Sequence, residues 1–254
     1  MAKIISIVNQ KGGVGKTTTA VNLAASLGAI GYKTLLIDID PQGNSTSGVG
    51  INKREVKNSS YDIIIGNAST NETIIKTEFK NLFLIASNID LAAAEIEIVD
   101  LEHRESRLKN AILPVRGDYD FILIDCPPSL GLITTNALCS SDSIIVPIQC
   151  EYYALEGLSQ LMNTVRRIKR QYNDRLEIEG VLLTMYDGRL NLTQQVVREV
   201  KKYFPKKVFR TAIPRGVRLS EAPSFGKPII YFDAVSKGSD AYISLAKEII
   251  NKNN

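Results

Sequence analysis

Short, nearly continuous apolar runs alternate with longer stretches of helical periodicity along this chain. The runs are rich in isoleucine, leucine and valine, which is typical of parallel strands covered by helices on both faces. We expect strands at residues 4–8, 34–39, 82–86, 121–124, 143–148 and 178–184, with a further candidate at 208–211. We expect helices at residues 21–30, 102–113, 132–139, 155–171 and 193–203. This alternation predicts right-handed βαβ crossovers and one doubly wound, mostly parallel α/β sheet with helices on both faces.

Residues 42–81 are the least regular part of the pattern. Glycine, serine and asparagine cluster there around a single apolar run at 63–65, so we expect short helices and loops. No internal repeat, low-complexity tract or long linker interrupts the chain. Its 254 residues are a normal length for one α/β domain, and we therefore predict a single domain over residues 1–254.

A glycine-rich loop follows the first apolar run and precedes the first helical pattern. Backbone N–H groups of such a loop surround a phosphate, and the helix N-terminus adds partial positive charge. Lys16 would reach the β- and γ-phosphates of ATP, and the Thr17 hydroxyl would bind Mg²⁺. The general P-loop has a glycine where this chain has Gln10, so the loop follows the deviant pattern K-G-G-x-G-K-T. The residues predicted to bind nucleotide here are Lys11, Gly12, Gly13, Val14, Gly15, Lys16, Thr17 and Thr18.

Three acids lie at the carboxyl ends of predicted strands. Asp125 follows the apolar run 121–124, which is the usual Walker B arrangement for holding Mg²⁺ directly or through water. Asp38 and Asp40 are two residues apart, so on an extended strand their side chains point the same way. Ligands of open α/β sheets bind beyond these strand ends, where all three acids could meet one Mg·ATP. The alternative is that one of them only caps a turn.

The charge distribution predicts a polyanionic partner. The formal net charge is only +4. Between residues 189 and 218, however, there are nine basic residues and a single acid, Glu199, which leaves the rest of the chain mildly acidic. A basic segment of this kind favours nucleic acid at one face of the protein.

Cysteine content and hydropathy narrow the class of protein further. Three cysteines with no C-x-x-C spacing and one histidine argue against a disulfide framework or a zinc site, and a reducing cytoplasm is the simplest compartment. No run approaches the roughly 20 apolar residues of a membrane span. The segment 242–254 is helical in pattern but lacks the basic and bulky apolar faces of an interfacial anchor. We therefore expect no membrane partner.

Four motifs together resemble the ParA/Soj family of chromosome and plasmid partition ATPases. They are residues 11–19, 38–44, 124–129 and 213–223, and they extend from near the first residue to about residue 227. The resemblance implies an ATP- and Mg²⁺-dependent homodimer that binds double-stranded DNA without sequence preference on the nucleoid. It also implies a ParB-like centromere-binding partner that stimulates slow hydrolysis and release.

The resemblance also implies roles at the nucleotide. Lys11 would cross a two-fold interface to the partner subunit's phosphates and act with Lys16 in catalysis. Asp40 would orient the attacking water, and Asp38 would support the Mg²⁺ shell beside Thr17 and Asp125. Backbone near Pro214 would lie beside the adenine. Without the resemblance, Lys11 would be interpreted as a solvated surface lysine.

For DNA, the resemblance points to Arg189 and Arg218, which match arginines that hold the DNA backbone in family members. Lys201 and Lys202 lie on the outward side of the predicted helix 193–203, together with Arg198. For these three residues, a solvated helix face and a DNA contact explain the pattern equally well.

Two other classes compete with a partition ATPase. A MinD-like membrane-cycling positioning ATPase is the main alternative, and it would need a C-terminal amphipathic anchor. A redox ATPase of the nitrogenase-reductase type shares the deviant P-loop and would use cysteines to hold an iron–sulfur cluster. Cys126 adjoins two prolines here, and buried inert cysteines explain Cys126, Cys139 and Cys150 better.

Overall fold

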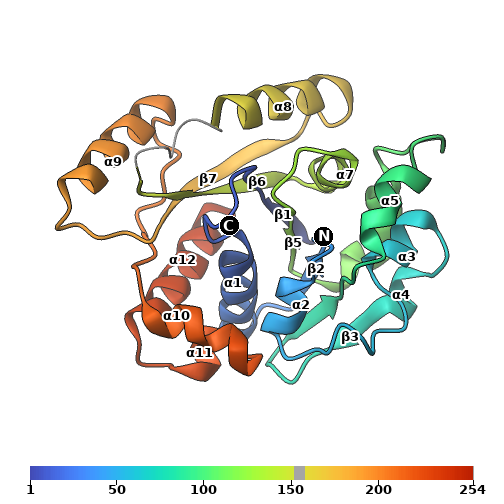
Figure 1. Cartoon of the computed structure of the whole chain (residues 1–254), viewed down its shortest axis with the longest axis horizontal. Helices are drawn as coiled ribbons and strands as arrows, with labels where there is room; N and C mark the ends of the chain where they lie inside the picture. Colours follow the sequence, from blue (N-terminus) through green and yellow to red (C-terminus); the bar gives the residue numbers. More distant parts are fainter. Residues whose placement is uncertain (152–157, 254) are drawn as a thin grey trace.

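The computed structural model describes residues 1–151 and 158–253. Within these residues, seven strands form one sheet in the order β3-β4-β2-β5-β1-β6-β7 (Figure 1). All neighbouring strands are parallel except β3, which pairs antiparallel with β4 at one edge. The strands are β1 (Lys3–Ile7), β2 (Thr34–Asp38), β3 (Ile74–Lys76), β4 (Leu82–Ile85), β5 (Phe121–Asp125), β6 (Ser143–Gln149) and β7 (Glu177–Thr184). The mostly parallel α/β sheet predicted from the sequence is confirmed.

Helices cover both faces of the sheet. On one face lie α1 (Lys16–Ile30), α10 (Val217–Glu221), α11 (Ile229–Phe232) and α12 (Lys237–Asn253), whose apolar side chains share one core cluster. On the other face lie α3 (Ser60–Ile65), α5 (Leu91–Glu97), α6 (Arg107–Ile112), α7 (Leu132–Ser140), α8 (Leu158–Gln171) and α9 (Asn191–Tyr203). Shorter elements are α2 (Asn44–Gly48), α4 (Thr70–Thr73) and two 3₁₀ segments, η1 (Leu113–Asp118) and η3 (Ala222–Phe225).

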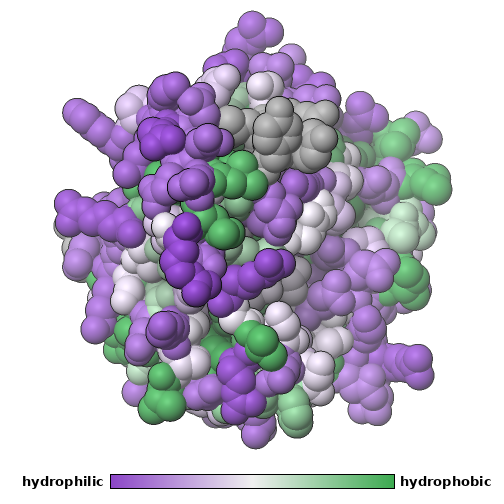
Figure 2. Space-filling model, turned by 60° about the vertical axis from the view of Figure 1, so that its left-hand side comes forward, coloured by the Kyte–Doolittle hydropathy of each residue, from purple (hydrophilic) through white to green (hydrophobic). Residues whose placement is uncertain are grey.

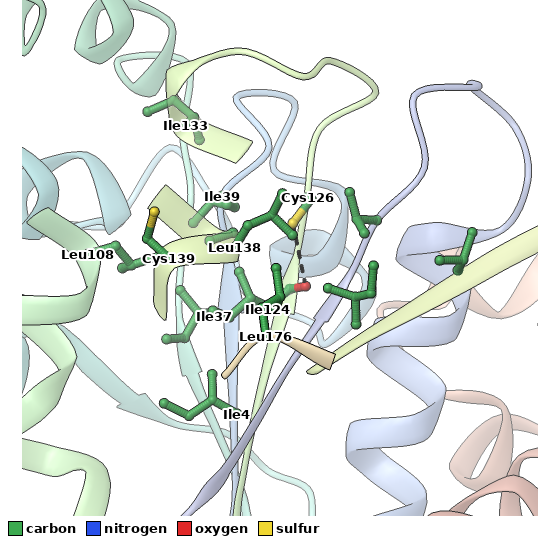
Figure 3. Close-up of a cluster of buried hydrophobic side chains, with 14 of the residues drawn as sticks. Ile4, Ile37, Ile39, Leu108, Ile124, Cys126, Ile133, Leu138, Cys139 and Leu176 are labelled. Carbon is green, nitrogen blue, oxygen red and sulfur yellow. Dashed lines mark hydrogen bonds between the residues drawn. The ribbon is translucent and has the colours of Figure 1, made fainter. Parts of the chain in front are cut away.

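The central strands are buried on both faces, which explains their nearly continuous apolar sequence. Every residue of β2 and β5 is buried. Alternate side chains of β5 enter opposite layers: Ile122 and Ile124 pack on the side of α7, and Leu123 packs on the side of α1. Figure 3 shows Ile124 among the buried side chains of the first of these layers.

Two predicted elements differ in the structure. Residues 208–211 do not form a strand: Val208 makes only an isolated bridge to Val181 of β7. The reason is that Glu248 of α12 accepts hydrogen bonds from the backbone N–H groups of Arg210 and Thr211, at 2.9 and 3.1 Å. These N–H groups are therefore not available to continue a ladder with β7.

The helix predicted at 102–113 is shorter than expected. Residues 102–105 form turns, because His103 has a φ of +54° and the Arg104 carbonyl accepts a hydrogen bond from Asn136 of α7. Regular α-helix is confined to Arg107–Ile112 and continues as 3₁₀ structure through η1. The short strand β3 was not predicted, although the short helices and loops expected over 42–81 are present. Residues 155–157 of the helix predicted at 155–171 lie outside the described residues.

Candidate nucleotide site and basic surface

The glycine-rich loop connects β1 to α1 at the carboxyl edge of the sheet. Gly13 and Gly15 have φ values of +74° and +87°, a left-handed conformation that favours glycine. Gly15 is the N-cap of α1, so the helix begins at Lys16 and its first N–H groups face the loop. This local geometry is that of an anion-binding loop.

The loop is tied to the neighbouring strands β6 and β7. Asn9 accepts a hydrogen bond from the Lys11 N–H at 3.0 Å and donates to the carbonyl of Pro147 in β6 at 2.8 Å. The Thr184 hydroxyl of β7 donates to the Val14 carbonyl at 2.8 Å. These contacts fix the loop from both sides, so its shape does not depend on a bound nucleotide alone.

Lys16 is buried, and its Nζ donates to the Lys11 carbonyl at 3.0 Å. Burial lowers the pKa of Lys16, an effect that the nearby Asp125 opposes. Lys11 itself is half-buried, and its ammonium makes no ion pair with any residue that the structure describes. Gly12 and Gly13 are exposed, and Thr17 and Thr18 are half-buried at the start of α1.

Asp38 and Asp125 end two neighbouring strands, β2 and β5, in direct register, and both are fully buried. Asp125 Oδ2 accepts a hydrogen bond from Ser45 Oγ at 2.7 Å, and Oδ1 is buried without a hydrogen-bond partner among the described residues. Asp38 Oδ1 accepts from the Asp40 N–H at 3.1 Å. Asp38 Oδ2 accepts from both the N–H and the hydroxyl of Thr46, each at 2.8 Å.

These two carboxyl groups make the site electrostatically unfavourable without a cation. Burial raises the pKa of Asp125 to about 7 and the charge of Asp38 contributes further, while the hydroxyls of Ser45 and the nearby Thr17 oppose the shift. Burial also raises the pKa of Asp38 to about 6, against the hydrogen bonds from Thr46. A buried carboxylate oxygen with no donor, beside a second acid, fits a bound divalent cation.

The third acid, Asp40, lies just beyond β2 and is also buried. Its Oδ1 accepts a hydrogen bond from the Gln42 N–H at 2.9 Å, so Asp40 does cap the turn after β2. This contact occupies one carboxylate oxygen and sets the orientation of the group. The charge of Asp40 acts on Lys16 as well, and it opposes the lowering of the Lys16 pKa by burial.

A pocket of about 400 Å³ adjoins the loop. Gly15 and Thr18 line one side, and Pro214 lies in the wall with its neighbours Ile213 and Arg215. A bridge between Tyr186 and Pro214 places the loop after β7 beside this wall. The structure therefore brings Pro214 close to the glycine-rich loop.

The two arginines predicted for DNA lie on the surface in different surroundings. The Arg189 side chain is 89% exposed and pairs with Asp187 at 2.6 Å. The Arg218 side chain is 56% exposed and pairs with Glu221 at 3.0 Å and with Asp233 at 2.9 Å. Both guanidinium groups therefore have acidic partners within their own segment of surface, which holds them in place and partly neutralises them.

Lys201 and Lys202 are exposed near the end of α9, and Lys202 pairs with Glu199 at 2.6 Å. Sequence reasoning missed α8 as a second basic helix. Its exposed arginines Arg166, Arg167 and Arg170 lie outside the basic segment 189–218. The run R-R-I-K-R at 166–170 was the available signal. A pocket of about 350 Å³, lined by Arg166 and Tyr203 among others, lies between α8 and the end of α9, so the two helices form one surface.

Figure 2 turns the side with α9, α10 and α12 forward. Hydrophilic residues cover most of this side, and hydrophobic residues appear only in small separate groups. The apolar face of α12 is buried against α1 through residues such as Tyr242, Leu245 and Ile249. In the described part of the chain, no helix combines the length and hydropathy needed to cross a bilayer.

All three cysteines are buried and unpaired by disulfides. Burial raises the pKa of Cys139 to about 12 and that of Cys150 to about 11. Figure 3 shows Cys126 and Cys139 among apolar side chains, with the Cys126 thiol 3.9 Å from the Ile124 carbonyl. Over residues 1–151 and 158–253, no group of three or more His, Cys, Asp or Glu side chains could hold a metal alone. Mg²⁺ needs fewer protein ligands, because it keeps waters and substrate phosphates.

Comparison with known proteins gives a consistent family. A family model described as an AAA domain matches residues 2–178. The chain is 60% identical to the sporulation initiation inhibitor protein Soj of Bacillus subtilis, with 98% of each chain covered. It is 51% identical to the chromosome partitioning protein ParA of Myxococcus xanthus, covering 99% of this chain and 89% of that protein.

Solved structures agree with the fold. A cobyrinic acid a,c-diamide synthase from Mycobacterium smegmatis, with a bound ATP analogue and magnesium, is 33% identical with a TM-score of 0.88 over 99% of this chain and 95% of that one. The cell division ATPase MinD of Pyrococcus furiosus is 28% identical with a TM-score of 0.82, and both chains are fully covered.

The fold, the glycine-rich loop and the strand-end acids together define a P-loop ATPase of the α/β class. Within that class, the extent and level of identity to Soj and ParA are decisive. The chain belongs to the ParA/Soj family of chromosome partitioning ATPases.

Proposed function

We propose that this protein is an ATP-driven DNA partition switch, formed by one ATPase domain over residues 1–254. ATP closes a homodimer, and the dimer binds double-stranded DNA of the nucleoid, in the cytoplasm, without reading its sequence. A ParB-like partner then stimulates an otherwise slow hydrolysis that releases the DNA. The observation that carries the proposal is the convergence of the deviant P-loop with Asp38, Asp40 and Asp125 at one edge of the sheet.

ATP and Mg²⁺ are the cofactors that this edge fits. The loop residues 11–18 would surround the phosphates, with the Lys16 ammonium on the β- and γ-phosphates. Thr17 and Asp125 would hold Mg²⁺ with support from Asp38, and the unpartnered Oδ1 of Asp125 supports this assignment. A bound Mg²⁺ would offset negative charge on the phosphates. The pocket beside Pro214 has room for the base.

Asp40 is the residue we assign to the attacking water. Its Oδ1 is held by the Gln42 N–H, which gives the carboxylate a fixed orientation near Lys16. A positioned carboxylate can orient a water and accept its proton. Hydrolysis that depends on one carboxylate is expected to be slow until a partner completes the site.

Lys11 is the residue we assign to the dimer. It lies at the exposed entrance of the loop next to Gly12 and Gly13, and its ammonium has no ion-pair partner among the described residues. A second copy that faces this edge would bring its phosphates within reach of that ammonium. ATP would then be part of the interface, which makes dimerisation depend on nucleotide.

Arg189, Arg218, Lys201 and Lys202 are the residues that we assign to DNA. The helices α9 and α10, which carry three of them, lie on the side of the molecule that Figure 2 turns forward. All four residues are exposed, and they are spread over the loop after β7 and the helices α9 and α10. Contacts of this kind go to phosphates and carry no base information. The MinD-like alternative gains no support from α12, whose apolar face is committed to α1.

Two variants test the proposed cycle by light scattering with ATP. Lys11→Ala should bind ATP but stay monomeric, because only the contact across the interface is lost. Asp40→Ala should bind ATP and accumulate as a dimer, because hydrolysis is slowed while binding is intact. Normal ATP-dependent dimerisation of Lys11→Ala would contradict the role across the interface.

A further inference from the structure

We infer that Ser45 and Thr46 of α2 are positioning residues, which hold Asp125 and Asp38 in the orientation that Mg²⁺ requires. This inference rests on the proposed function, because it concerns the cation of the nucleotide site. Neither residue belongs to the P-loop or to the strand-end acids. Both come from the irregular region after β2, where sequence reasoning found no site residue.

Each of the two hydroxyls donates a hydrogen bond to a different one of the two acids. Ser45 Oγ donates to Asp125 Oδ2 at 2.7 Å, and Thr46 Oγ1 donates to Asp38 Oδ2 at 2.8 Å. All four residues are fully buried. Since Asp38 and Asp125 end adjacent strands in register, one turn of α2 spans both carboxylates.

The hydrogen bond from Ser45 decides which oxygen of Asp125 stays available. With Oδ2 occupied, Oδ1 is the buried oxygen without a partner among the described residues. A buried carboxylate oxygen without a donor is costly, and a cation is the natural partner for it beside a second acid. Rotation of the Asp125 carboxylate would break the Ser45 bond, so the hydroxyl fixes the ligand before the cation arrives.

The donors are themselves held in place. Thr46 Oγ1 accepts a hydrogen bond from the Ser87 N–H at 2.9 Å, which orients its own hydroxyl proton toward Asp38. The chain after α2 packs tightly on the segment after η3: a Cβ added to Gly226 would lie 2.7 Å from the Gly50 Cα. Gly226 also has a φ of +62°. A Thr46 hydroxyl held by both Ser87 and Asp38 loses little freedom when it orients a ligand, which is the requirement for a preorganised site.

The neighbouring Ser47 provides a matched control. Its hydroxyl lies on the same short helix but donates to the Gly43 carbonyl at 3.2 Å and touches neither acid. A Ser47→Ala change therefore removes a hydroxyl from α2 without affecting Asp38 or Asp125. Thr46→Ser provides a second control, because it keeps the hydroxyl and removes only a methyl group.

The test measures ADP affinity by calorimetry over a series of Mg²⁺ concentrations, with EDTA as the zero point. Loss of an outer-shell partner of a metal ligand typically weakens metal affinity about 10- to 100-fold. Ser45→Ala should raise the Mg²⁺ concentration of half-maximal effect by that factor. Thr46→Val should raise this Mg²⁺ concentration by only about 10-fold, because the backbone N–H of residue 46 still donates to Asp38. ADP affinity in EDTA should stay at the wild-type value in both variants, and Ser47→Ala and Thr46→Ser should match the wild type throughout.

Two outcomes would overturn the inference alone. One is an unchanged Mg²⁺ midpoint in Ser45→Ala and Thr46→Val. The other is a loss of ADP affinity that is equal with and without Mg²⁺ and accompanies a lower melting temperature, since this shows a purely structural role. The Thr46→Ser and Thr46→Val pair decides the matter if Ser45→Ala does not fold. A wild-type protein that binds no ADP under any condition would instead overturn the proposed function, and the inference with it.

Discussion

The nucleotide edge and the basic surface of this protein are built in opposite ways. At the nucleotide edge, Lys16, Asp38 and Asp125 are buried, and the fold brings them together from the start of α1 and the ends of β2 and β5. On the basic surface, Arg189 and Arg218 are exposed and form ion pairs with Asp187, Glu221 and Asp233 at the surface of the molecule. The first region is therefore a buried charged site, whereas the second consists of solvent-exposed ion pairs.

This difference has a consequence for function. Buried charges with incomplete hydrogen bonding are costly, so a bound nucleotide and cation would stabilise the nucleotide edge. One protomer already has this arrangement without a second copy. On the basic surface, Arg189, Lys202 and Arg218 already pair with acids, and one copy offers few phosphate contacts. Two copies on one duplex raise the effective concentration of the second copy, so DNA affinity should follow dimerisation.

The largest expected effect comes from the nucleotide edge. Lys16→Ala removes the buried ammonium that the phosphates would face, and a net loss of about 3 kcal/mol for a hydrogen bond to a charged group corresponds to about 100-fold weaker ATP binding. ATP-dependent DNA binding should disappear with it. Calorimetry with ATP measures the affinity, and thermal unfolding checks that the variant is folded. Wild-type affinity in a folded variant would refute the P-loop assignment.

A smaller but selective effect comes from the exposed arginines. Arg189→Glu and Arg218→Glu should each abolish DNA binding at physiological salt and leave ATP-dependent dimerisation intact. Each change removes one phosphate contact per copy, so the salt slope of any residual binding should fall by about 2 for the dimer. Filter binding over a salt series, with light scattering on the same samples, makes this measurement.

Asp187→Asn is the matched control for Arg189. It removes the acid that pairs with the arginine and keeps the arginine itself. DNA binding in this variant should equal or exceed that of the wild type. Weaker binding would show that Asp187 is needed to hold Arg189 in place, and that the two regions differ less than proposed.

The smallest effect is expected on α9. Lys201→Glu should weaken DNA binding less than either arginine change. Lys201 lies on an exposed helix face, and lysines occupy such faces in proteins that do not bind DNA. The same filter-binding series decides the order of the three variants. If Lys201→Glu loses as much DNA affinity as Arg189→Glu, the DNA-binding surface would instead include α8 and α9, where Arg166 and Arg170 are also exposed.

Much of the sheet could be predicted, because buried parallel strands leave continuous apolar runs and the P-loop leaves a glycine pattern. The deviations have specific physical causes. Glu248 of α12 binds the N–H groups of Arg210 and Thr211, and this contact between distant segments leaves no trace in the local pattern of residues 208–211. The strand β3, with only three residues at the edge, was too short to give a periodic signal.

The candidate site was predictable only in part for a related reason. Residues whose chemistry is visible from type and spacing, such as Lys16 and Asp125, could be found in the sequence. Ser45 and Thr46 could not, because serine and threonine are common in loops and only the fold brings them to Asp125 and Asp38. The ion pair between Arg218 and Asp233 was also not predicted, since Asp233 is 15 residues away along the chain.

The measurement that tests the central claim most directly is DNA binding by the wild-type protein in three nucleotide states. A biosensor series with ATP, with ADP and without nucleotide should show binding only with ATP, on any duplex sequence, and with affinity that falls steeply as salt rises. This is expected because the basic surface of one protomer binds DNA too weakly, and because ATP is required to join two protomers in the proposed dimer. Equal affinity in all three states, or a clear preference for one DNA sequence, would contradict the account.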